Sequence, residues 1–200
     1  MKRLFILLFF IFFSPGVFSQ EFTGGILFGF VSSQLDGDRH AGYHKASINF
    51  GGYVNRNISP QLSGQMELKF IQKGSYSSGK DMNDPDYYKS QLNYIEIPVL
   101  LNYMYGKFLF EAGLSAGYLF NAKEDKDGYG LMPAEPPYST PFKKYEFCGI
   151  AGFNYQVLQR LKVNFRFEYS ILPVRYNPGS LYFNGNQFNN VLTFSVYYQL

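Results

Sequence analysis

Residues 161–171, with the sequence LKVNFRFEYSI, alternate strictly between apolar and polar side chains. Every odd-numbered position carries Leu, Val, Phe, Tyr or Ile, and every even-numbered position carries Lys, Asn, Arg, Glu or Ser. Side chains of a β-strand point alternately to opposite faces, so the segment predicts a strand with one apolar face and one charged face. As a helix, the same residues would spread their charges around every side.

The alternation recurs along the chain with different side chains. Together with weaker examples it predicts eight strands of roughly 10–13 residues, the length that a tilted strand needs to cross a membrane. Pro98 lacks a backbone donor and should mark a bulge or a local gap in the hydrogen-bond ladder. The predicted strands are 22–32, 45–54, 62–70, 92–103, 108–120, 145–155, 161–171 and 191–200.

The connections between these strands alternate between short and long. Segments 55–60, 105–107 and 156–160 are short, whereas segments 34–43, 75–90, 121–143 and 173–189 are long and polar. Outer-membrane barrels have short periplasmic turns and longer extracellular loops, and an even number of strands lets the sheet close. The sequence therefore predicts an all-β fold, an eight-stranded antiparallel up-and-down transmembrane β-barrel.

The first residues read as a separate segment. Residues 1–3 are Met-Lys-Arg, an apolar run covers 4–13, and Ser19 ends a small-residue cleavage pattern. We therefore expect a secretory signal peptide at 1–19 and the barrel domain at 20–200, because ten apolar residues are too few to span a bilayer. Without Lys2 and Arg3, 16 basic residues face 15 acidic ones, which gives no argument for a nucleic-acid partner.

The polar faces of the strands predict a charged lumen. An eight-stranded barrel has an interior that side chains just fill, and charges there must be paired or hydrated. We expect Arg166 to lie between carboxylates such as Glu67 and Glu111, in an ion-paired plug; the alternative is a narrow ion-conducting path. The predicted lumen charge network is Lys45, Glu67, Lys69, Glu96, Glu111, Glu146, Lys162, Arg166 and Glu168.

The residues give little support for an enzyme. Cys148 is the one cysteine and lies inside a strand-like run, which is typical of an inert structural thiol. His40 and His44 lie beside Asp36 and Asp38 in the first long segment, a composition usual for a solvated turn, and no hydrolase or zinc-protease motif is present. We expect no catalytic residues, no metal site and no cofactor.

Two stretches resemble a known family. The stretch LNYIEIPVLLNY at 92–103, followed by FEAGLSAGYL at 110–119, resembles the PorT-type, porin-like outer-membrane β-barrel proteins of Bacteroidetes-like bacteria. The stretch ELKFIQKGS at 67–75, with Gly74 near its end, resembles the same family. The resemblance implies an eight-stranded outer-membrane barrel and no single activity, although PorT itself is associated with a protein-secretion apparatus.

We therefore expect a non-enzymatic protein of the bacterial outer membrane, with a structural, interaction, or transport and secretion-accessory role. Its expected partners are outer-membrane lipid and an envelope protein that binds the long extracellular loops. These loops contain aromatic residues such as Tyr129 and Tyr176, which could contact a partner. We expect a monomer. Two alternatives remain open: a soluble exported barrel of lipocalin type that binds a small apolar ligand, and an outer-membrane enzyme that acts at the rim. A lipocalin would place Phe165 inside and Arg166 outside.

Overall fold

The computed structural model describes residues 22–38, 42–78, 87–126, 128–136, 140–176 and 183–200. The predicted signal peptide at 1–19 and His40 lie outside these residues. All regular elements in the described part of the chain are β-strands. None of the described residues form a helix with the length and apolar character needed to cross a membrane.

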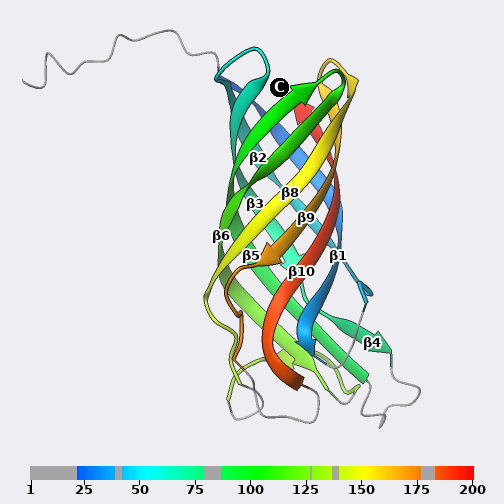
Figure 1. Ribbon diagram of the computed structural model, residues 1–200. Helices are drawn as coiled ribbons and strands as arrows, with labels where there is room; N and C mark the ends of the chain where they lie inside the picture. The colour runs from blue at the N-terminus through cyan, green and yellow to red at the C-terminus, as the bar shows by residue number, and fades with distance from the viewer. Residues whose placement is uncertain (1–21, 39–41, 79–86, 127, 137–139, 177–182) are drawn as a thin grey trace, which may run out of the picture.

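Eight long strands form a closed antiparallel ring, and two short strands, β4 and β7, extend it at one end (Figure 1). The strand order is β5-β3-β2-β1-β10-β9-β8-β6, and the pairing of β5 with β6 closes the barrel. The strands are β1 (Phe22–Asp38), β2 (Lys45–Asn57), β3 (Leu62–Lys73), β4 (Tyr76–Ser78), β5 (Tyr87–Tyr105), β6 (Phe108–Asp125), β7 (Met132–Pro133), β8 (Tyr145–Leu158), β9 (Leu161–Ser170) and β10 (Phe183–Gln199).

The ring of eight strands confirms the predicted fold, but the predicted lengths were wrong for half of the ring. Strands β1, β5, β6 and β10 have 17 to 19 residues. Their pairing continues well into the segments predicted as long loops: Leu35 pairs with Asn189, and Lys89 pairs with Asp125. A band of barrel wall therefore extends beyond the segment that crosses the membrane.

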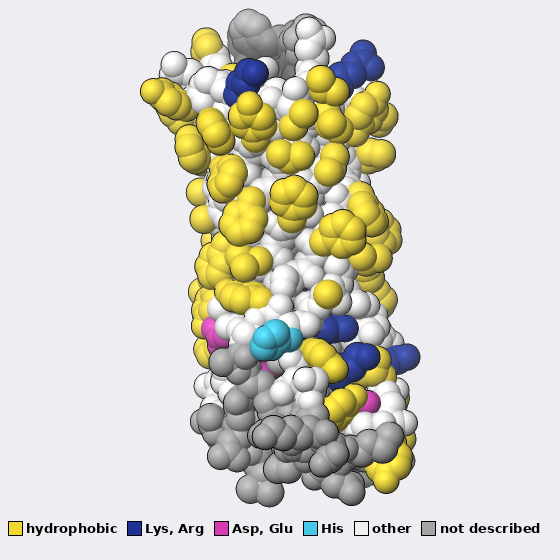
Figure 2. Space-filling model, turned by 90° about the vertical axis from the view of Figure 1, so that its right-hand side faces the viewer, with side chains coloured by type: hydrophobic (Ala, Val, Ile, Leu, Met, Phe, Trp, Pro, Cys, Tyr) yellow, Lys and Arg dark blue, Asp and Glu magenta, His cyan; other side chains and the backbone are white. Residues whose placement is uncertain are grey.

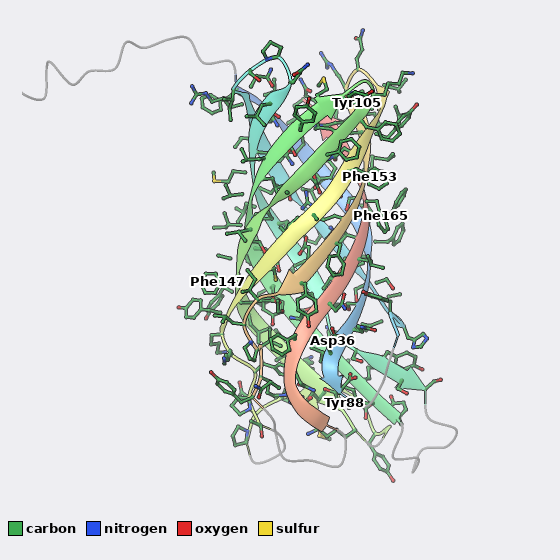
Figure 3. The ribbon with its side chains drawn as sticks, in the orientation of Figure 1. Asp36, Tyr88, Tyr105, Phe147, Phe153 and Phe165 are labelled. Atoms are coloured by element: carbon green, nitrogen blue, oxygen red, sulfur yellow. The ribbon has the colours of Figure 1, made fainter. Side chains whose placement is uncertain are left out.

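In the central part of the barrel, the apolar face of the strands points outward. In β9, Phe165 is 42% exposed whereas Arg166 is 1% exposed. Figure 2 shows the resulting belt of hydrophobic side chains on one face of the barrel, and Figure 3 shows Phe147, Phe153 and Phe165 directed away from the wall. This facing is the opposite of the one that a lipocalin requires, because a lipocalin would bury the aromatic face and expose the charged one.

Pro98 interrupts one ladder, as predicted. On the β3 side of β5, Met66 pairs with Val99 and Lys69 pairs with Glu96, in the same register but with no paired residues between them. On the β6 side, Pro98 still pairs with Ser115. The missing donor of proline therefore leaves a local gap in one ladder and no register shift.

The short turns and both ends of the described chain lie at one end of the barrel (Figure 1). There the backbone amide of Leu200 donates a hydrogen bond to the carbonyl of Gly24, which ties the last residue to the first strand. Short turns mark the periplasmic side of an outer-membrane barrel, so the opposite end, with the long connections, is extracellular.

Candidate functional site: the filled lumen and the outer mouth

The barrel contains two zones with opposite polarity. Along β5, the outward positions are apolar from Ile95 to Tyr103 and turn polar at Asn93, Gln91 and Lys89 toward the extracellular end. The inward positions change from polar to apolar in the same direction: Glu96 is followed, toward the extracellular end, by buried tyrosine and leucine side chains. We call the part of the barrel on the extracellular side of Ile95 the outer extension. Its apolar interior and polar surface resemble those of a protein in water.

The centre of the lumen holds an arginine between two carboxylates. The Arg166 Nε donates to Glu111 at 2.5 Å, and its Nη1 and Nη2 donate to the two oxygens of Glu67, both at 2.9 Å. Nη2 also reaches the Tyr197 hydroxyl at 3.1 Å. Strands β3, β6, β9 and β10 supply these four side chains, so the contacts cross the lumen. The guanidinium has the placement that the alternation of the strands predicts.

A second group, the lysine cluster, lies next to the arginine on its extracellular side. It consists of Lys69, Lys73, Glu96, Glu146 and Glu168, all fully or almost fully buried. Lys73 Nζ lies 2.5 Å from Glu96, 3.2 Å from Glu146 and 3.8 Å from Glu168, and Lys69 contacts Glu96 and Glu168. Arg166 Nη1 lies 3.8 Å from Glu168, which joins the two groups into one network.

Carboxylates outnumber cations in this network, five to three. Amide and hydroxyl groups also donate hydrogen bonds to some of these carboxylates. Asn154 and Asn164 donate to Glu111 at 2.9 and 3.0 Å, and Ser170 and Asn189 donate to Glu146 at 2.6 and 2.9 Å. Hydrogen bonds to buried carboxylates offset part of the cost of removing them from water. The interior is thus filled by a connected polar network.

Seven of the nine residues predicted for the lumen charge network lie in these two groups, and two do not. Lys45 is buried on the inward face and Lys162 is half-buried, but neither forms an ion pair with any described residue. The Lys162 ammonium instead lies 5.4 Å from the ring centre of Tyr53. The sequence prediction also missed Lys73, which continues the inward positions of β3 past the predicted strand end.

The extracellular mouth is closed by an apolar cluster, the mouth plug. Strand residues and residues from the long connections contribute to it, so these connections fold inward over the lumen. The plug comprises Val31, Leu35, Ile71, Tyr88, Leu92, Tyr94, Leu119, Ala134, Phe142, Val174 and Val191.

A buried ion pair fixes the connections to the wall. Arg175 Nη2 lies 2.7 Å from Glu124 and 3.3 Å from the Tyr88 hydroxyl, and the guanidinium lies 3.9 Å from the ring centre of Phe142. Figure 3 places Tyr88 at this end of the barrel. Tyr88 belongs to the outer extension, and burial together with the Glu124 carboxylate holds the pKa of its phenol well above the ordinary value.

Cys148 belongs to the lumen and is not a reactive site. It is 1% exposed, and its Sγ lies 3.7 Å from Lys73 Nζ. Glu96, Glu146 and Cys148 form the one group of three metal-type ligands in the described part of the chain. The Lys73 ammonium contacts all three, so a lysine already holds the position that a cation would take. His44 is exposed and contributes nothing to this group.

Comparisons with known proteins agree with this architecture. Residues 15–175 match the model of the family described as outer membrane protein beta-barrel domain. Two crystal structures of Ail, the attachment invasion locus protein of Yersinia pestis, one with the heparin analogue sucrose octasulfate, are 12% and 10% identical to this chain, with TM-scores of 0.51 and 0.50. Each alignment covers 90% of this chain and 99% of Ail. At that identity the likeness concerns the fold alone. A search of curated proteins found no match.

Proposed function

We propose, from the premise that this chain belongs to the family of outer membrane protein beta-barrel domains, that it is a non-conducting barrel whose activity is binding at its extracellular end. The protein lies in the bacterial outer membrane, and its role is structural or one of interaction. The observation that supports the proposal is the filling of the lumen by buried charges and of the mouth by apolar side chains.

A path for ions would have to pass two obstacles in series. The first is the network around Arg166 and Lys73, in which every cation contacts at least two carboxylates. The second is the mouth plug, which Arg175 and Glu124 fix in place. Opening the path would require breaking buried ion pairs, which costs several kcal/mol for each charge left alone (~3–5 kcal/mol).

Single-channel recording tests this proposal. The mature chain, folded in detergent and added to a planar bilayer, should give no discrete conductance steps in 1 M KCl, whereas a porin added to the same membranes should. Steady steps from the wild-type chain would contradict the closed lumen. The same preparation should be monomeric by native mass spectrometry, as expected from the closed ring.

Binding at the extracellular end is supported by the outer extension, which holds exposed side chains beyond the apolar belt. Met132 in β7 is 50% exposed there. In a Cys148→Ser background, a photo-crosslinker on Met132→Cys should capture an envelope protein in intact cells. The same label on Lys107→Cys, in a turn at the periplasmic end, is the matched control. Equal capture by both positions would contradict a partner at the extracellular end.

The resemblance of residues 92–103 in β5 and 110–119 in β6 to PorT-type barrels supports a more specific role. On that resemblance, the chain serves as an accessory of protein secretion. Deleting it in the bacterium that makes it should reduce the amounts of proteins recovered from the culture medium, and the chain supplied on a plasmid should restore them. Unchanged secretion would refute this role and leave the outer-membrane barrel as it stands.

A further inference from the structure

The wall of the outer extension has a pocket of about 300 Å³ between β6 and the connections that follow it. Pairing of β6 with β8 ends at Tyr118 and Tyr145, and β7 takes over only at Lys123 and Glu124. The pocket opens in the interval between these two pairings. It is lined by Leu119, Phe120, Asn121, Ala122, Lys123, Pro133, Ala134, Glu135, Pro141, Phe142 and Lys144.

Two lysines line this pocket without a carboxylate partner. Neither Lys123 nor Lys144 forms an ion pair with another described residue, although Glu135 also lines the pocket. Lys143, by contrast, is engaged with the ring of Tyr176 at 3.8 Å. The pocket therefore presents two available ammonium groups and one opposing carboxylate, and its remaining polar group is the Asn121 amide.

The pocket lies at the level where lipid headgroups meet the barrel. Directly on its membrane side are Phe120, 47% exposed, and the paired rings of Tyr118 and Tyr145, whose centres are 5.6 Å apart. Aromatic girdles of this kind mark the boundary of the hydrocarbon region.

We propose that this pocket binds a phosphate group of a phosphorylated glycolipid from the outer leaflet. The acyl chains of the glycolipid would lie on the aromatic surface of Phe120, Tyr118 and Tyr145, and its phosphate would accept hydrogen bonds from Lys123 and Lys144. The position of the pocket favours a glycolipid as the source of the phosphate, because the pocket lies beside the outer leaflet and that leaflet is built from such glycolipids. The inference concerns a lipid ligand and does not depend on the lumen being closed.

Native mass spectrometry of the folded full-length mature chain tests it, with diphosphoryl lipid A as the probe. Each lysine near an anionic lipid surface contributes a factor of about five in affinity, so Lys123→Gln with Lys144→Gln should weaken binding about thirty-fold. The matched control is Lys107→Gln with Arg160→Gln, which removes the same charge from exposed turns at the periplasmic end and should leave binding unchanged. Glu135→Gln should strengthen binding.

Three results would overturn the assignment. Dephosphorylated lipid A or phosphatidylglycerol that binds as tightly as diphosphoryl lipid A would remove the phosphoglycolipid as the ligand. An equal loss of lipid A affinity in the control double variant would mean that the effect comes from the net charge of the protein and not from the pocket. Weaker binding after Glu135→Gln would exclude a phosphate beside that carboxylate. Far-UV circular dichroism of each variant establishes that the barrel has folded before binding is compared.

Discussion

Replacing Arg166 by Met should strongly destabilise the barrel, because it removes the cation that the buried carboxylates of Glu67 and Glu111 share. The change deletes five hydrogen bonds, two to Glu67, two to Glu111 and one to Tyr197. Both carboxylates are almost fully buried, and Lys69 is already engaged by other carboxylates. Breaking a buried ion pair from one side costs about 3–5 kcal/mol. At a urea dependence of ~2 kcal/mol per molar, the unfolding midpoint should fall by about 2 M.

The assay is urea unfolding of the folded chain in phospholipid vesicles, followed by circular dichroism and by the altered gel migration of the unfolded form. Arg160→Met, at an exposed periplasmic turn, is the matched control and should change stability by less than about 0.5 kcal/mol. Combining Arg166→Met with Glu67→Gln and Glu111→Gln should restore most of the loss, because neutral groups replace the unpaired charges. Two results would contradict this prediction: Arg166→Met unfolds at the same urea midpoint as Arg160→Met, or the triple variant is no more stable than Arg166→Met alone.

Three further predictions concern the wall, the thiol and the lipid face. A Cβ on Gly29 would lie 2.5 Å from the carbonyl oxygen of Phe194, so Gly29→Ala should lower stability by about 1–3 kcal/mol in the same urea assay, whereas Gly64→Ala, whose nearest atom is 3.8 Å away, should be neutral. Cys148 should react with a maleimide only in urea concentrations that unfold the barrel; rapid labelling of the folded form would mean an open lumen. Phe165→Arg should cost about 2–4 kcal/mol in vesicles, and Phe165→Leu less than about 1.5 kcal/mol; similar values for both would argue against lipid at that face.

The alternation of β9 and β3 made the interior predictable, because a strand offers only two faces and one of them must meet lipid. The prediction stopped at Phe70, where Ile71 breaks the polar sequence of the inward face. The positions nevertheless continue: Glu67, Lys69, Ile71 and Lys73 all point inward. An apolar residue on the charged face looked like the end of the pattern, but Ile71 belongs to the mouth plug.

Other parts could not be predicted, because they depend on contacts between distant segments. In the pairing of β5 with β6, Asn93 pairs with Asn121 and Tyr94 with Leu119, so Phe120 is an extra residue. This bulge reverses the inward and outward positions that follow in β6, so continued alternation from Glu111 would have placed Glu124 on the outer face. Arg175 lies in a segment with no periodicity, and only the folded chain brings it to Glu124.

The two zones of opposite polarity imply two separate sources of stability. Within the belt, lipid solvates the apolar surface, and paired charges have to fill the space inside. In the outer extension, water surrounds the wall, and burial of side chains such as Leu35, Tyr88 and Val174 contributes as it does in a soluble protein. The outer extension therefore does not need the bilayer to keep its shape. Because buried side chains occupy the lumen in both zones, the binding surfaces that we propose lie outside it, at the extracellular rim and on the outer wall just beyond the belt.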